Sequence, residues 1–543
     1  MLPDDPETFV SNFVNRDSLT ILHTNVLKAR ASGLISYYRG GSEELMPRTG
    51  KNEIVLVPMS DYQFKQYSLV RLEELKETPE EESEEEAGKP KKKGMTAAEA
   101  DLYEQATKSL NTGFLCGSRA ACNWVFPEDV PRPIVDPKKK EKLLGIEKDR
   151  VLSVDAAVEP RAAAAGKKRP TIPKAVTAAT AGGAGAPATT APAAATEAPE
   201  GTVMPDEEDA DAIPEPIDQS IVSEVTSLMS GLEARADIHL NASLPEFSAK
   251  YATMLENIRN SPGPALVYSQ FITLEGLGIF AAAMRAGPEK YLQLDLVKEE
   301  GEWTIPAVLM TPEALARPRY ILYTGAQDPE KRRLCLQLYN ADLAALPRRL
   351  REQCEIMLAG APDNRDGRVC RVFMISSSGA EGISLFNTRQ VNIMEPYWNN
   401  VRLQQVVGRA IRLCSHMNLP WEDRVVDVFT YMSVFTARQK AEGPKKIMSS
   451  DKGKSTDQII YDIATKKQKL ADGLYEIAQT AATDCEIHFH EHGAVTQCYK
   501  FAEGSRPMFA YHPDWEKDVK NSGVRTTAAA PRASAAAASA AEE

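Results

Sequence analysis

Residues 371–416 read RVFMISSSGAEGISLFNTRQVNIMEPYWNNVRLQQVVGRAIRLCSH, and this stretch decides the fold. The apolar runs at 372–375 and 391–394 predict two buried strands, and a helix is expected to begin near residue 400. A loop rich in serine and glycine follows the first strand, where open α/β sheets place their ligands. The order strand, loop, strand, helix therefore predicts an α/β sheet with a binding site at its carboxyl edge.

The expected helix carries two arginines on one face. Four residues fall at i, i+3, i+4 and i+7 and share that face: Gln405, Gly408, Arg409 and Arg412. Apolar side chains on the other faces are expected to pack inward: Val406, Val407, Ala410 and Ile411. Arginines aimed at one buried spot require an anion or a carboxylate, and Gly408 leaves room for a close approach to the backbone. The alternative is an amphipathic helix with a solvated basic stripe.

Two segments of this stretch resemble motifs of the superfamily 2 helicases. Residues 378–385 (SGAEGISL) resemble motif V, and residues 405–412 (QVVGRAIR) resemble motif VI. Residues 395–402 (EPYWNNVR) resemble the Swi/Snf-like branch. The closest resemblance is to the helicase-like ATPases of large cytoplasmic DNA viruses: poxvirus nucleoside triphosphatase I, the small subunit of the poxvirus early transcription factor, and relatives in asfarviruses and giant viruses.

Five apolar runs alternate with helical patterns and predict one parallel RecA-like sheet flanked by helices. They lie at 264–271 (which resembles motif IV), 320–323, 372–375, 391–394 and 425–430. The resemblance and the composition divide the chain as follows: 1–76, tail of the first RecA-like lobe and start of an insert; 77–98, disordered charged linker; 99–155, inter-lobe segment; 156–218, low-complexity Ala/Pro/Thr linker; 219–440, second RecA-like lobe; 441–515, helical C-terminal extension; 516–543, disordered tail.

The sequence contains no phosphate loop and no acidic pair after an apolar strand, both of which a motor of this superfamily needs. The tripeptide at 453–455 (GKS) lacks the preceding glycine, because Met448 occupies that position, and the acidic run at 206–209 lies in a linker. We therefore expect ATP and Mg²⁺ to be used only with a first lobe carrying these motifs, supplied by a partner chain or missing from the gene model. A catalytically inactive nucleic-acid or transcription-complex module is the alternative.

The resemblance also implies roles for single residues. Arg412 is implied to be the arginine finger on the γ-phosphate, and Arg409 is its neighbour. ATP binding and coupling are implied for Gln405, Gly408, Glu381 and Gly382. Contacts to the phosphates of a DNA or RNA strand are implied for Ser269, Gln270, Thr324, Gly325, Ser377 and Ser378.

Composition limits the remaining choices. The net charge of −12 excludes a protein that coats nucleic acid by bulk attraction, so such contacts must be local. The eight cysteines lack CxxC pairs and are expected to be reduced thiols of a soluble intracellular protein. No metal site is expected, since Cys485, His488, His490, His492 and Cys498 fit no standard zinc spacing. No membrane contact is expected either, since the sequence has no run of about 18 apolar residues. The resemblance implies the host cytoplasm, viral factory or virion and the viral transcription machinery; the basic run at 166–170 leaves the nucleus open.

Overall fold

The computed structural model describes residues 3, 5–15, 19–37, 43–77, 115–130, 132, 219–325, 327–376, 382–487 and 497–499. The expected linker at 156–218 and tail at 516–543 lie outside these residues, as does almost all of the expected linker at 77–98. Within the described residues, no helix is long and apolar enough to cross a membrane.

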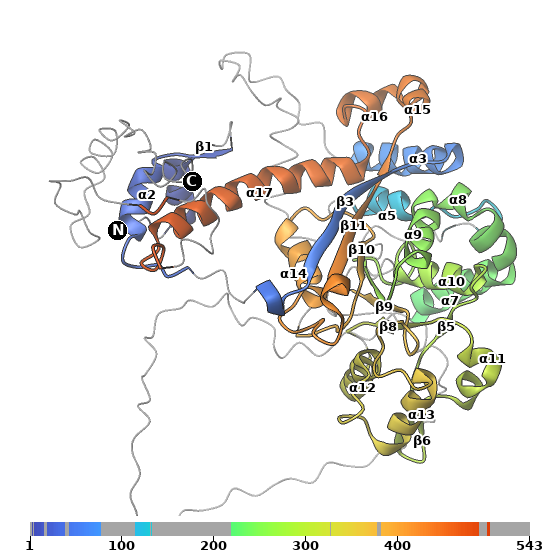
Figure 1. Cartoon of the computed structure of the whole chain (residues 1–543). Helices are drawn as coiled ribbons and strands as arrows, with labels where there is room; N and C mark the ends of the chain where they lie inside the picture. The colour runs from blue at the N-terminus through green and yellow to red at the C-terminus, as the bar shows by residue number, and fades with distance from the viewer. Residues whose placement is uncertain are drawn as a thin grey trace, which may run out of the picture.

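A parallel sheet of seven strands forms the centre of the molecule (Figure 1), in the order β3-β11-β10-β4-β9-β8-β5. The strands are β3 (Arg48–Pro58), β4 (Ala265–Tyr268), β5 (Leu292–Gln293), β8 (Arg319–Tyr323), β9 (Val372–Ile375), β10 (Gln390–Ile393) and β11 (Val425–Val434). All five strands expected from the sequence are present and parallel, which confirms the predicted α/β class and its RecA-like lobe.

Helices cover both faces of the sheet, because the strands bury side chains on both sides. In β4, Ala265 and Val267 face one core, whereas Leu266 and Tyr268 face the other. The first core is closed by α7 (Gln219–Ala234), α8 (Leu244–Phe247), α9 (Ala249–Arg259) and α10 (Leu277–Ala286). The second is closed by α12 (Pro329–Asn340), α13 (Arg348–Leu358) and α14 (Asn400–Ala410).

Strand β3 corrects the predicted domain boundaries. The sequence placed residues 1–76 in the first lobe and the start of an insert, but β3 pairs with β11 as the edge strand of this sheet. Ten-residue β11 would otherwise present unpaired backbone groups along its edge. Helix α3 (Asp61–Glu77) follows, and Ser60 caps it by accepting from the Gln63 amide at 2.8 Å. The Gln63 side chain instead donates to the carbonyls of Ala121 and Cys122 in α5 (Cys116–Asn123).

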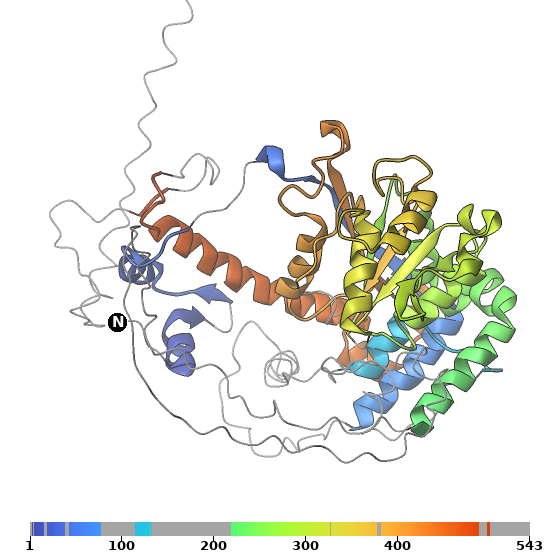
Figure 2. The ribbon, with the colours of Figure 1, turned by 90° about the horizontal axis from the view of Figure 1, so that it is seen from below.

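Helix α17 (Thr456–Ala481) leaves the sheet and extends to a small N-terminal unit (Figures 1 and 2). Ser455 and Gln458 form its capping box, so the tripeptide at 453–455 starts a helix. The N-terminal unit consists of α1 (Pro6–Phe13), β1 (Val14–Asn15), β2 (Thr20–Ile21) and α2 (Thr24–Ala31). Phe13, Val26 and Leu27 pack against Ile477 of α17. Residues 6–31 therefore lie outside the RecA-like sheet.

Short elements complete the described part of the chain. They are α11 (Pro312–Leu315), α15 (Ala437–Glu442), α16 (Lys445–Ser450), the hairpin of β6 (Val297–Glu299) and β7 (Glu302–Thr304), 3₁₀ helices at 43–45, 307–310 and 421–423, and a π-helical turn at 237–242. One cysteine pair contradicts the prediction of free thiols throughout. Cys485 and Cys498 form a disulfide, and the Tyr499 amide donates to the carbonyl of Thr480 in α17 at 2.7 Å.

Candidate functional site

Helix α14 presents the arginine-bearing segment beside the carboxyl ends of the strands. The Asn399 side chain caps it by accepting from the Val401 amide at 3.0 Å. Its inward face is apolar, as predicted, and the buried residues are Leu403, Val406 and Ala410. Val407 and Ile411 are partly buried against the same core.

Arg412 lies just beyond the end of α14. Ile411 has a ψ of 88°, which ends the helix at Ala410, so the prediction that Arg412 shares a helical face with Gln405 is wrong. The Arg412 guanidinium is exposed, and its Nη1 donates to the carbonyl of Ile383 at 2.9 Å. Among the described residues it forms no ion pair with a carboxylate. This arginine can therefore bind an anion from outside the chain.

The turn after α14 is held in place by buried polar contacts. Ser415 Oγ lies 2.8 Å from His416 Nδ1, and His416 Nε2 lies 2.7 Å from the carbonyl of Thr388. Burial lowers the pKa of His416 to about 4, so its ring is neutral near pH 7. A neutral ring donates from Nε2 to Thr388 and accepts at Nδ1. These contacts fix the backbone that carries Arg412.

The remaining predicted residues of α14 differ in exposure. Gln405 is exposed and Arg409 is partly buried. A Cβ at Gly408 would meet no atom within 4 Å, so nothing in the described chain requires glycine there for space. The surface at Gly408 is open to an approaching group, as the sequence predicted.

The loop after β9 lies beside this helix. Its end is tied to α14 by the Leu385 amide, which donates to the carbonyl of Arg409 at 3.0 Å. Gly382 has a φ of 73°, a left-handed conformation that favours glycine. Ser377, Ser378 and Glu381 lie outside the described residues.

Two predicted phosphate contacts follow β8 at the same edge. Thr324 is 1% exposed, and Gly325 is partly exposed. Because β8 pairs with β9, this turn lies next to the start of the loop at 376–382. The structure thus brings the turn after β8 next to Ser376, the residue that follows β9.

Ser269 and Gln270 are too deeply buried to contact a bound strand directly. Ser269 Oγ donates to Glu395 at 2.9 Å, and the Gln270 amide donates to the same carboxylate at 2.6 Å. The Gln270 side chain accepts from Arg119 of α5. Both side chains are buried, because α5 covers the carboxyl ends of β4 and β10. The structure therefore does not expose them as their predicted role demands.

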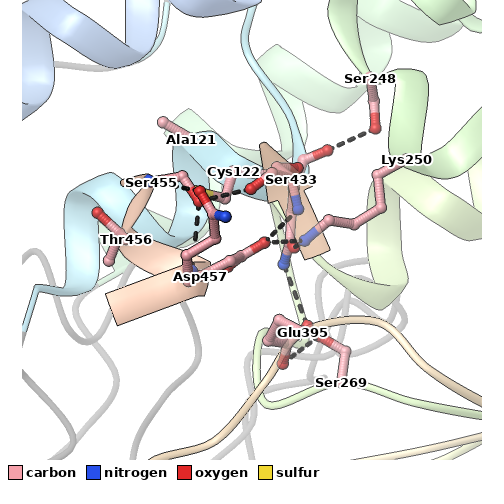
Figure 3. Close-up of polar contacts among 12 residues, drawn as sticks. Ala121, Cys122, Ser248, Lys250, Ser269, Glu395, Ser433, Ser455, Thr456 and Asp457 are labelled. Carbon is pink, nitrogen blue, oxygen red and sulfur yellow. Dashed lines mark hydrogen bonds and ion pairs between the residues drawn. The ribbon is translucent and has the colours of Figure 1, made fainter. Parts of the chain in front are cut away.

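A buried polar network continues from Glu395 to α17 (Figure 3). Asn123 Nδ2 donates to Glu395 at 3.2 Å, and Asn123 Oδ1 accepts from Lys250 at 2.9 Å. Lys250 also pairs with Asp457 at 2.7 Å, and Asp457 accepts from the Ser433 amide at 2.9 Å. Burial is the main cause that raises the pKa of Glu395. The network joins α5, α9, α17 and three strand ends.

Sequence reasoning missed most of this network. Glu395 was noted only as part of a segment resembling the Swi/Snf-like branch, and Asn123 only as part of the inter-lobe segment. A signal existed for Lys250, because Phe247, Tyr251, Met254 and Ile258 recur at helical spacing around it in the sequence. A lysine in that position requires a buried carboxylate. Nothing in the sequence pointed to Asp457 as its partner.

The described residues contain no group of three or more side chains arranged to hold a metal ion. His488, His490 and His492 lie outside them.

The fold and the motifs at its carboxyl edge define a RecA-like lobe, and comparisons with known proteins give its relatives. One relative is a protein of Acanthamoeba polyphaga mimivirus that is named a putative ATP-dependent RNA helicase. It is 26% identical over 96% of this chain and 55% of its own length. A termination factor NPH-I homolog of African swine fever virus is 30% identical over 50% of this chain and 37% of its own length. The nucleoside triphosphatase I of Heliothis armigera entomopoxvirus is 30% identical over 24% of this chain and 18% of its own length.

The chain is thus similar to proteins of large DNA viruses that are named as helicases, termination factors and nucleoside triphosphatases. It spans about half the length of the mimivirus relative, and less of the others. No family model matches the chain. The C-terminal part of the Fun30 ATPase domain aligns with a TM-score of 0.30 and 13% identity over 78% of this chain and 99% of that structure. This likeness is too low to assign a fold, so the fold is assigned from the sheet described above.

Proposed function

We propose that this chain is the second RecA-like half of a nucleic-acid-dependent ATPase of viral transcription or genome handling. The observation that carries the proposal is the exposed Arg412 guanidinium, which lacks a carboxylate partner in the described chain and is oriented by the Ile383 carbonyl. An arginine finger stabilises the charge that spreads over the γ-phosphoryl oxygens in the transition state. ATP and Mg²⁺ would be held by a first lobe on another polypeptide or in a part of the protein outside these 543 residues.

Other residues of the edge support this role. Arg409 and Gln405 stand on α14 next to the open surface at Gly408, where a nucleotide or the first lobe can approach the helix. Glu381 and Gly382 would couple this region to the bound strand. Gly382 lies close to Arg412, since the Arg412 side chain donates to the carbonyl of the next residue, Ile383.

The contact to nucleic acid would use backbone groups of Gly325 and the hydroxyls and backbone groups of Ser377 and Ser378, which bind phosphates without reading sequence. Thr324 is 1% exposed and would join only if this edge opened. Ser269 and Gln270 would join only if α5 moved away from β4. The domain limits that fit this role are 48–77, 115–132 and 219–450, because their elements share one sheet and its covering layers.

Reconstitution with a first lobe that carries a phosphate loop and an acidic pair tests the proposal. The 543-residue chain alone should hydrolyse no ATP, since it lacks both motifs. In the restored complex, Arg412→Ala should reduce turnover about a hundredfold or more. Nucleic-acid affinity should change little, and Arg412→Lys should not restore turnover because a point charge cannot replace the planar fork.

Arg438→Ala is the matched control, since Arg438 is exposed on α15 and pairs with Glu442. ATPase rate and oligonucleotide affinity would be measured for all variants in one buffer. An equal loss of binding and turnover in Arg412→Ala would assign Arg412 to strand binding or to structure.

A catalytically inactive interaction module is the second candidate. The internal use of Ser269 and Gln270 favours it, because a motor that grips a strand through these residues would need them free. The two candidates separate in the same experiment. A complex with a competent first lobe that binds nucleic acid but never hydrolyses ATP would support the module.

A further inference from the structure

A cavity of about 210 Å³ lies between α3 and α5, and Arg412 is not among its lining residues. Tyr62 and Val70 of α3 form one wall, and Trp124 and Phe126, which follow α5, form another. Arg132 and Glu275 contribute its charged lining. Figure 1 shows α3 and α5 side by side above the sheet. Since a cavity of roughly 150 Å³ admits benzene, this one has room for a planar heterocycle.

The cavity has unsatisfied polar atoms in its lining. Trp124 is 1% exposed and Glu275 is 3% exposed, yet Trp124 Nε1 and Glu275 Oε2 have no hydrogen-bond partner among the residues that the structure describes. Arg132 Nη2 is also buried without a partner. Unpaired groups of this kind are costly, and native proteins usually satisfy them with water or a ligand. The lining therefore offers one acceptor and two donors.

The aromatic walls are held rigidly. Trp124 stacks on Tyr251 with ring centroids 6.0 Å apart, and Phe126 meets its edge at 6.4 Å. Glu275 Oε1 pairs with Arg132 at 2.5 Å, which holds the carboxylate and leaves Oε2 available. A ligand would find this arrangement already formed, which lowers the cost of binding.

We propose that this cavity binds a nucleobase that carries an exocyclic amino group, either from a free nucleotide or from an unstacked base of a strand. The amino group would donate to Glu275 Oε2, and a ring nitrogen or keto oxygen would accept from Trp124 Nε1 or Arg132 Nη2. A tyrosine or tryptophan side chain of a protein offers a single polar atom, so it would leave part of this set unpaired. Adenine, guanine and cytosine carry the amino group, whereas uracil does not.

The test titrates the full chain with AMP, GMP, CMP and UMP by calorimetry. At least one of the amino-bearing nucleotides should bind at least about tenfold tighter than UMP. Glu275→Gln should remove that difference, because an amide at this position does not supply the same charged acceptor. Trp124→Phe should weaken binding with the ring retained. Glu256→Gln is the matched control, since Glu256 is exposed on α9 and is not among the residues that line the cavity.

Two further arms complete the design. Arg412→Ala should leave mononucleotide binding unchanged, which separates this site from the proposed ATP edge. Competition of oligo(A) with AMP assigns the site to a strand, and its absence assigns it to a free nucleotide. Thermal melting of each variant confirms folding. Binding of none of the four nucleotides, or equal binding of all four that survives in Glu275→Gln and Trp124→Phe, overturns the proposal.

Discussion

The ammonium of Lys250 lies 2.7 Å from the carboxylate of Asp457, and the side chains are 0% and 2% exposed. This pair connects α9 with the first turn of α17. Removing one partner leaves an uncompensated charge in the interior. Lys250→Met should therefore lower the free energy of unfolding by about 3–5 kcal/mol, measured by denaturant titration.

The control for this change is the exposed pair of Lys454 with Asp462. Lys454→Met should alter stability by less than about 1 kcal/mol, because solvent screens surface pairs. If both variants had the same small effect, the buried pair would not hold α17 to the lobe.

Glu395 accepts hydrogen bonds from Ser269, from the Gln270 amide and from Asn123. Glu395→Gln places an amide nitrogen among these donors and cannot satisfy all of them. We expect a loss of about 1–3 kcal/mol of stability. Hydrogen exchange should show faster opening of α5, which this carboxylate anchors. Unchanged exchange in α5 would contradict the anchoring role.

His416 predicts a pH dependence of stability. Its pKa is lowered from 6.5 to about 4 in the folded protein, so the unfolded chain binds the proton more tightly. The stabilisation is complete above pH 6.5 and is lost as pH falls from 6.5 towards about 4. The loss amounts to about 3 kcal/mol at most.

His416→Gln should flatten this part of the profile, measured by unfolding titrations from pH 7.5 to about 4. The pKa of His239 is lowered too, through burial and Arg235, so the comparison is between wild type and variant at each pH. Parallel profiles for the two proteins would exclude His416 as the cause.

The disulfide of Cys485 and Cys498 predicts a local effect of reduction. Residue 483 donates to the Ile35 carbonyl, and Asp484 accepts from the Tyr37 amide at 3.0 Å, so the N-terminal unit is joined next to the disulfide. Closing a loop with a sequence separation of 13 contributes about 3 kcal/mol. A dithiol reductant should speed tryptic cleavage near Lys28 and leave the lobe resistant.

Cys414→Ser is the control variant, since that thiol is free and exposed, whereas Cys335 is buried in the lobe. Cys485→Ser should reproduce the effect of the reductant, and Cys414→Ser should not. Equal cleavage rates with and without reductant would show that packing on Ile477 holds the N-terminal unit.

The sequence by itself determined the central layers. Apolar runs at 265–268, 372–375 and 425–430 are long enough to bury both faces of parallel strands, and they formed strands. The start of the helix at Asn400 also followed from a local pattern. These features depend on residues within a few positions of each other, so periodicity and capping rules reach them.

Tertiary structure alone decided the rest. Pairing of β3 with β11 joins residues more than 300 positions apart, as does the docking of residues 6–31 on α17. The sequence shows that Asp457 carries a carboxylate, but only the arrangement of α9 against α17 makes it the partner of Lys250. The end of α14 before Arg412 depends on the turn that Ser415 and His416 form with Thr388. Side-chain identity fixes what a residue can bind, but distance in the folded chain fixes which partner it meets.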